Sequence, residues 1–271
     1  MKTVQKRVRF KIGKLKAFGI FLVFSLATGL SQNHAEENIT LSFSDGRADV
    51  NGIEDINSIL NKVGVRVNAV DIPKEAKPIL KASTTRALNK DEVDELLPLF
   101  YLDRRDLLRQ IKKAGRRPAT PRGGHLSTKE ENMTPYPKIY DMKTLSPEIV
   151  LFLQEKFGKL HVNSSDDGFG IDEVMTIVSG GPWTWFFELP DNVVGKLTLG
   201  HVGLNDLAWR LSYPGLVPHG GYFDAEYGLV VAFAHGPEKF VMRYEYPNVN
   251  DSGLLGKNPW IDFSGKSPKL L

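Results

Sequence analysis

The spacing of hydrophobic residues changes character about halfway along the chain. In the first half, apolar residues recur at helical intervals in short segments such as 53–63 and 103–114. After residue 174, short apolar runs alternate with turns that contain Gly and Pro, which is the pattern of antiparallel strands. The sequence therefore predicts an α+β fold: a helix-rich α/β part, then a mainly antiparallel β sandwich or barrel-like part.

The first of these parts is predicted over residues 36–115. It begins with a strand at 39–43, a helix over 53–63 and a second strand at 65–70. Two further helices are predicted over 91–100 and 103–114. The outer face of the last helix is basic, which is typical of a solvated surface and is also compatible with a patch that binds an anion or a lipid headgroup. That face carries Arg104, Arg105, Arg109, Lys112 and Lys113.

Residues 116–137 have the composition of a linker. They hold four prolines and the pair Gly123-Gly124, with almost no apolar side chains. This composition favours a domain boundary, with the β domain at 138–271. A segment of this kind can also wrap around the surface of a single domain, and both interpretations stay open.

The N-terminus predicts a secretory signal peptide over residues 1–35. Seven basic residues fall within the first 16 positions, and an apolar run at 17–30 follows. That run is short for a bilayer, which needs roughly 20 residues. We therefore expect an exported, periplasmic or extracellular protein that starts near Glu36 and keeps no stable membrane span. N-terminal sequencing of the exported protein tests this, and a retained Met1 would contradict it.

Removing this leader reverses the net charge. The whole chain carries +3, whereas 28 basic and 32 acidic residues remain beyond position 35, a net charge of −4. An acidic mature chain argues against nucleic acid as a partner. The absence of cysteine excludes disulfides, thiolate metal sites and cysteine nucleophiles. No hydrolase elbow, phosphate-binding loop or dinucleotide fingerprint is present.

Residues 163–173 form an acidic, Gly-containing stretch that is superficially like a calcium loop. Val174 occupies the twelfth position, where such a loop needs a bidentate glutamate. A polar turn between two elements is the favoured interpretation of this stretch.

The strongest candidate site lies in residues 196–246. Three of the six histidines, His201, His219 and His235, fall there, together with Asp224 and Glu226. Imidazole and carboxylate groups are common ligands of divalent transition metals, so the pattern suggests a metal site. His219 and His235 can meet only if residues 220–226 fold back along the strand that follows them. The alternative is that these residues are ordinary polar groups in turns.

A second hypothesis is a binding module without enzymatic activity. Trp183 and Trp185 are two residues apart and so share one face of a predicted strand. With Tyr222 they would form a platform for a sugar or an aromatic small molecule. The same face would equally serve as sheet core. An envelope-associated interaction protein is the third hypothesis, and the sequence leaves open whether the protein is an enzyme.

Overall fold

The computed structural model describes residues 38–120, 123–246 and 253–271. The predicted signal peptide lies outside these residues. Among the described helices, none is both long and apolar enough to cross a membrane.

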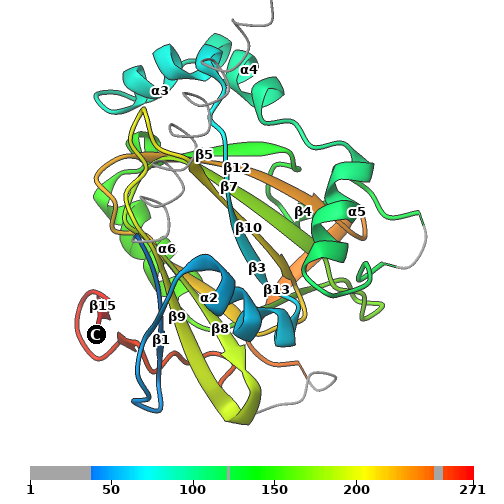
Figure 1. The fold of residues 1–271 in the computed structure, drawn as a ribbon. Helices are drawn as coiled ribbons and strands as arrows, with labels where there is room; N and C mark the ends of the chain where they lie inside the picture. Colours follow the sequence, from blue (N-terminus) through cyan, green and yellow to red (C-terminus); the bar gives the residue numbers. More distant parts are fainter. Residues whose placement is uncertain (1–37, 121–122, 247–252) are drawn as a thin grey trace, which may run out of the picture.

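Two five-stranded antiparallel sheets pack face to face at the centre of the protein (Figure 1). Sheet A has the order β11 (His219–Tyr222), β8 (Trp183–Leu189), β9 (Val193–Leu199), β1 (Ile39–Phe43), β2 (Val50–Asn51). Sheet B has the order β3 (Arg66–Val70), β10 (Ala208–Pro214), β7 (Asp172–Gly180), β12 (Gly228–His235), β5 (Lys138–Asp141). Their inner faces share one hydrophobic core, and the predicted α+β class with mainly antiparallel sheets is confirmed.

Strands from the N-terminal part are built into both sheets. β1 pairs with β9 along its whole length, and β3 pairs with β10. Isolated strands with one apolar face cannot bury that face alone, so they complete sheets formed mainly by the second half of the chain. The segment 116–137 therefore does not divide the sheets into two separate systems.

The predicted helices appear close to their expected positions. α2 (Ile53–Leu60) continues as a short 3-10 helix, Asn61–Val63, and packs on the core between the sheets. Most of the helices precede residue 115, and they contribute Leu80, Leu96 and Leu107 to a second core on the outer face of sheet B. These covering helices are α3 (Lys77–Ser83), α4 (Lys90–Leu99) and α5 (Arg104–Lys113).

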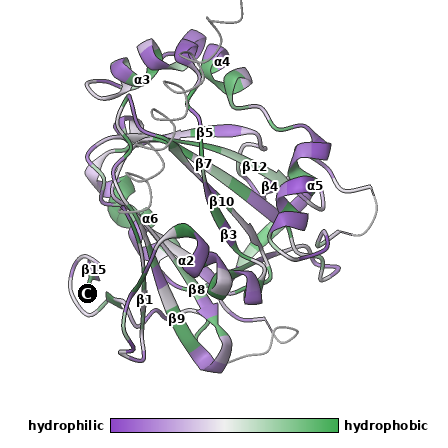
Figure 2. Cartoon of the chain, viewed as in Figure 1, coloured by the Kyte–Doolittle hydropathy of each residue, from purple (hydrophilic) through white to green (hydrophobic). Residues whose placement is uncertain are grey.

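Polar residues start these helices and cover their outer faces. Asn89 and Asp103 each form a reciprocal capping box with the residue three positions later. Figure 2 shows hydrophilic residues next to hydrophobic ones on α4 and hydrophilic residues over most of α5, whereas hydrophobic residues dominate β7 and β12 of sheet B. This amphipathic pattern explains why the helix periodicity was readable from sequence.

The segment 116–137 follows the surface of the β part. His125 forms a backbone bridge with Gly236. β4 (Lys129–Glu130) then pairs with β13 (Lys239–Arg243), which also pairs with β6 (Val162–Ser164). The segment is thus held by main-chain hydrogen bonds, together with Tyr136 in the central core and Leu126 against the core outside sheet B.

One buried ion pair fixes the start of this segment. The Nε of Arg116 donates to Oδ1 of Asp172 at 3.1 Å, and Nη1 donates to the Gly64 carbonyl at 2.7 Å. The backbone N–H of Ala119 donates to the other oxygen of Asp172 at 2.8 Å. Burial lowers the pKa of Arg116 and the charge of Asp172 acts in the opposite direction. The guanidinium stays charged and is the cation that faces this carboxylate.

The remaining elements lie around the sheets. α6 (Pro147–Gly158) packs against β11, and the 3-10 turns Lys74–Ala76, Met142–Thr144 and Pro190–Asn192 connect neighbouring elements. The C-terminal hairpin consists of β14 (Ile261–Asp262) and β15 (Lys269–Leu270). It covers the outer face of sheet A, where the Trp260 indole donates to the Val194 carbonyl at 2.9 Å.

Candidate functional site

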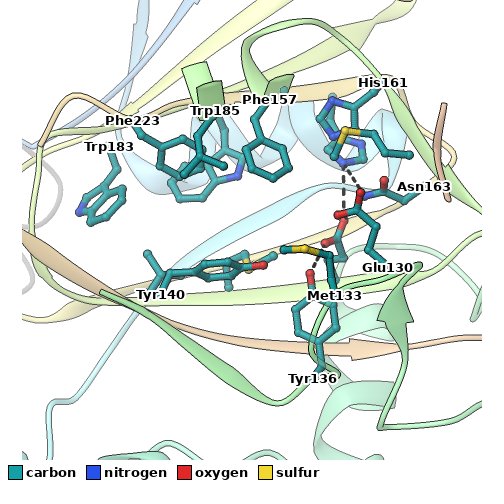
Figure 3. A pocket seen from close by; sticks show the side chains of 18 of the residues that line it. Glu130, Met133, Tyr136, Tyr140, Phe157, His161, Asn163, Trp183, Trp185 and Phe223 are labelled. Atoms are coloured by element: carbon teal, nitrogen blue, oxygen red, sulfur yellow. Dashed lines mark hydrogen bonds and ion pairs between the residues drawn. The ribbon is translucent and has the colours of Figure 1, made fainter. Parts of the chain in front are cut away.

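A cavity of about 320 Å³ lies between the inner faces of the two sheets. Residues of α6, of the segment that includes β4 and β5, and of both sheets form its walls (Figure 3). Eight Phe, Tyr and Trp side chains line it: Tyr136, Tyr140, Phe157, Trp183, Trp185, Tyr213, Phe223 and Phe240. The cavity thus has a mainly aromatic wall.

The strand β8 supplies the centre of this aromatic wall. Alternation along the strand directs Trp183 and Trp185 to the inner face, with ring centroids 6.3 Å apart. Phe223 meets the Trp183 ring edge-on at 6.4 Å and the Phe157 ring at 5.8 Å. Gly221, the partner of Trp185 across the sheet, carries no side chain and so leaves space beside the indole.

A buried glutamate, Glu173 on β7, organises the polar end of the cavity. The Tyr136 hydroxyl donates to its Oε1 at 3.1 Å, and the Asn163 amide donates to its Oε2 at 3.0 Å. The Nε2 of His219 lies 3.5 Å from the same Oε2. Figure 3 shows these contacts as dashed lines. The carboxylate is therefore removed from water and held mainly by neutral donors.

Two histidines with fixed tautomers, His161 and His219, line this end of the cavity. The Nδ1 of His161 contacts the Lys159 carbonyl at 2.9 Å, and that of His219 contacts the Val217 carbonyl at 2.7 Å. A carbonyl only accepts, so each Nδ1 carries the proton and each neutral ring has its lone pair on Nε2. The ring centroids are 4.5 Å apart. Burial, and then the neighbouring His219, hold the pKa of His161 well below its usual range.

The tyrosines around Glu173 are protonated donors. Burial raises the pKa of Tyr136, Tyr140 and Tyr213, and the charge of Glu173 raises all three further. Asn163 is only 4% exposed, yet its Oδ1 has no hydrogen-bond partner. The polar end therefore holds an amide acceptor that only a bound molecule or water can satisfy.

Of the histidines that the sequence predicted as metal ligands, His219 and His235 are both buried but lie on opposite sides of sheet B. His219 points into the cavity. His235 pairs with Asp172 across sheet B and shares the outer face with Val231 and Phe233. It is 1% exposed, and its Nδ1 is 3.8 Å from Asp172 Oδ2. Folding back of the intervening segment cannot join the two rings, because alternation along β12 turns His235 away from the cavity.

The other three predicted metal ligands lie at the surface. His201 is exposed and its Nε2 is 2.7 Å from the Tyr227 hydroxyl. Asp224 is exposed, and the Glu226 side chain is 89% exposed at 3.9 Å from Lys143. The structure thus does not bring the five predicted ligands together. Within the described residues, no group of three or more His, Cys, Asp or Glu is placed to hold a metal ion.

The cavity nevertheless contains donor types that transition metals prefer. His161, His219 and Glu173 supply two imidazoles and a carboxylate, and Asn163 supplies an amide oxygen. A hydrogen bond from Nδ1 to a carbonyl is the usual arrangement behind a metal-binding imidazole. A metal ion here would have to draw these side chains closer together than they stand.

Of the residues predicted to bind a ligand, the two tryptophans line the cavity and Tyr222 does not. The Tyr222 hydroxyl donates to the Pro268 carbonyl at 3.0 Å, on the side of sheet A that faces the C-terminal hairpin. Sequence reasoning missed Glu173, His161 and Asn163. A signal did exist: Glu173 directly precedes the apolar residues of a strand, where an acid is costly unless it has a role.

Comparison with known proteins assigns no family. No protein-family model matches the chain, and no curated protein matches it in sequence. Among solved structures, the chain is similar to an acireductone dioxygenase from Bacillus anthracis with a cadmium ion in its active centre. The sequence identity is 14% and the TM-score 0.47, covering 73% of this chain and 92% of that one.

Proposed function

We propose that the protein binds a small organic molecule in the cavity between its two sheets. The observation that carries this proposal is one cavity of about 320 Å³ with an aromatic wall and a buried Glu173 network at one end. Ligand sites are typically of this size, mainly apolar, with a few polar groups that orient the ligand. The flat apolar part of the ligand would lie against Trp183 and Trp185, and its polar group at Glu173.

Packing considerations support a ligand rather than an empty core. Protein interiors are close-packed, and voids larger than a water molecule are few. This cavity adjoins a buried carboxylate and the unpartnered Oδ1 of Asn163, so leaving it unfilled would cost hydrogen-bond energy as well as contacts. The walls are also fixed by strands and a helix, which is the rigid support a binding site needs.

Filling the cavity from Gly221 should abolish binding. A Cβ built on Gly221 meets only ordinary contacts, the nearest being a Phe223 ring atom at 3.7 Å. We therefore expect G221L to fold while its side chain occupies the space beside Trp185. Binding of the neutral fluorescent probe N-phenyl-1-naphthylamine should weaken at least about tenfold, because the apolar area buried by the probe is lost. Fluorescence titration of both proteins measures this.

The matched control is G265L in the C-terminal hairpin. A Cβ there also meets ordinary contacts, with Ser267 at 3.6 Å. This variant should bind the probe as the wild-type protein does. Unchanged binding by a folded G221L would place the probe elsewhere and remove the support for this cavity.

A divalent transition metal is the second candidate ligand. It is favoured by the fixed tautomers of His161 and His219, which put each lone pair on Nε2, and by Glu173, whose Oε2 lies 3.5 Å from the Nε2 of His219. Such an ion would act as a Lewis acid on a bound molecule. Metal analysis of the purified protein, with H219A alongside, distinguishes the candidates. Stoichiometric metal that is lost in H219A supports this second function, and a metal-free protein that binds the probe excludes it.

A further inference from the structure

The charges on the cavity wall are of one sign. Three carboxylates line it, and none of the lining residues is Lys or Arg. Two of these acids are already engaged: Glu130 pairs with Lys156 at 2.8 Å, and Asp141 accepts from the backbone N–H of Leu88 and Lys143. Glu173 is the third, and its hydrogen-bond donors, Tyr136 and Asn163, are neutral.

The polar end also presents more hydrogen-bond acceptors than donors. A carboxylate accepts up to about four hydrogen bonds, so Glu173 keeps capacity beyond its two donors. Asn163 Oδ1 is buried without a partner. The Nε2 of His219 is an acceptor as well, because its Nδ1 carries the proton, and its partner is the Asn163 amide nitrogen at 3.3 Å. A group that donates several hydrogen bonds and carries a positive charge satisfies the remaining capacity of Glu173 and the Oδ1 of Asn163.

The aromatic wall favours the same charge. Ring faces attract cations, and the nearby Lys138 shows this at the edge of the site. Its Nζ lies 4.5 Å from the Tyr136 ring centroid and 5.0 Å from that of Tyr140. The charge of Glu173 acts on Lys138, but Lys138 is not among the residues that line the cavity, so the lining itself contains no lysine or arginine.

We propose that the ligand is a primary amine with an apolar or aromatic body, bound as its ammonium ion. The N–H donors of an ammonium group match the remaining acceptor capacity of Glu173 and the unpartnered Oδ1 of Asn163. The hydrocarbon part lies against Trp183 and Trp185. This inference rests on the proposed ligand-binding function and adds the chemical class of the ligand. The same acceptors suit a divalent metal ion, so the experiment separates the two cations.

The test is a calorimetric titration with three ligands of nearly equal shape at neutral pH in EDTA. They are 2-phenylethylamine, 2-phenylethanol and 3-phenylpropanoate, which carry positive, zero and negative charge. We expect the amine to bind roughly 10- to 100-fold more tightly than the alcohol, as a charge-assisted hydrogen bond implies, and the acid to bind most weakly. E173Q should remove that preference and leave the affinity for the alcohol unchanged.

E155Q is the matched control, since Glu155 stands on α6 at the surface and pairs with Lys159. It should retain the preference for the amine. Equal affinities of the amine and the alcohol, or a folded E173Q that keeps the preference, would overturn the ammonium assignment. If E173Q does not fold, the affinities of the wild-type protein for the three ligands still test the ammonium assignment.

Two further outcomes have distinct meanings. Zinc titration without EDTA that shows tight binding, combined with no preference among the three organic ligands, assigns the acceptors to a metal and overturns the amine. Failure of all three ligands and of N-phenyl-1-naphthylamine removes the proposed function itself. Binding of the neutral probe without a preference for amines leaves the proposed function standing and overturns only this inference.

Discussion

Replacing Arg116 by methionine is expected to lower the free energy of unfolding by about 3–5 kcal/mol, the effect of leaving one member of a buried ion pair unpaired. Asp172 is 1% exposed, and the guanidinium supplies its charge partner at 3.1 Å. The methionine keeps most of the volume of the side chain, so the loss is mainly electrostatic. Urea unfolding followed by tryptophan fluorescence measures the change.

The surface arginine Arg109 provides the control. Its ion pair with Asp106 lies in the first turns of α5 and its side chain is 57% exposed, so R109M should cost less than about 1 kcal/mol. The double variant R116M/D172N should recover part of the loss, because the asparagine leaves no buried charge and can still accept from Ala119. An R116M protein as stable as R109M would show that Asp172 does not depend on Arg116 as its charge partner.

The second large effect is expected at Gly180, where β7 ends against β12. Its φ is +76°, and an added Cβ would lie 2.0 Å from the Tyr227 carbonyl oxygen and 2.5 Å from Gly228 Cα. G180A should therefore lose about 2–5 kcal/mol, which combines the left-handed backbone with overpacking against main-chain atoms that cannot move aside. Thermal or urea unfolding gives the value.

Gly46 isolates the backbone contribution. Its φ is +78°, nearly that of Gly180, and no atom lies within 4 Å of an added Cβ. G46A should lose only about 1–2 kcal/mol. The difference between the two variants reports the steric contact at Gly180, and equal losses would mean that the β7–β12 junction relaxes around a methyl group.

Elements that depend on local pattern were predictable from the sequence. The helix at α4 begins where Asn89 can cap it and Glu92 can complete the capping box. The strand β8 was evident from its run of β-forming aromatics between two turns. Such signals need only neighbours in sequence, and that is why the α+β class and most element positions agree with the structure.

The site depends on pairings that no local pattern reveals. His219 was identified as a candidate, yet Asn163, which contacts its ring, is 56 positions away. In the sequence, His235 looked as good a ligand candidate as His219. Its place in the alternation of side chains along β12 puts it on the outer face of sheet B, away from the cavity. The composition of the segment 116–137 is typical of a linker and does not show its attachments, which are backbone hydrogen bonds, the ion pairs of Arg116 and Glu130, and the buried Tyr136.

The adjacent residues Asp172 and Glu173 have two unrelated roles in the protein. Asp172 holds the start of the segment 116–137 through its ion pair with Arg116, and Glu173 faces the cavity. Successive side chains of a strand point to opposite faces of the sheet. Inserting or deleting one residue in β7 would therefore turn Asp172 toward the inner face and Glu173 toward the outer face. Each position can change its side chain independently during evolution, but a change of one residue in the length of this strand would remove both the ion pair with Arg116 and the carboxylate at the cavity.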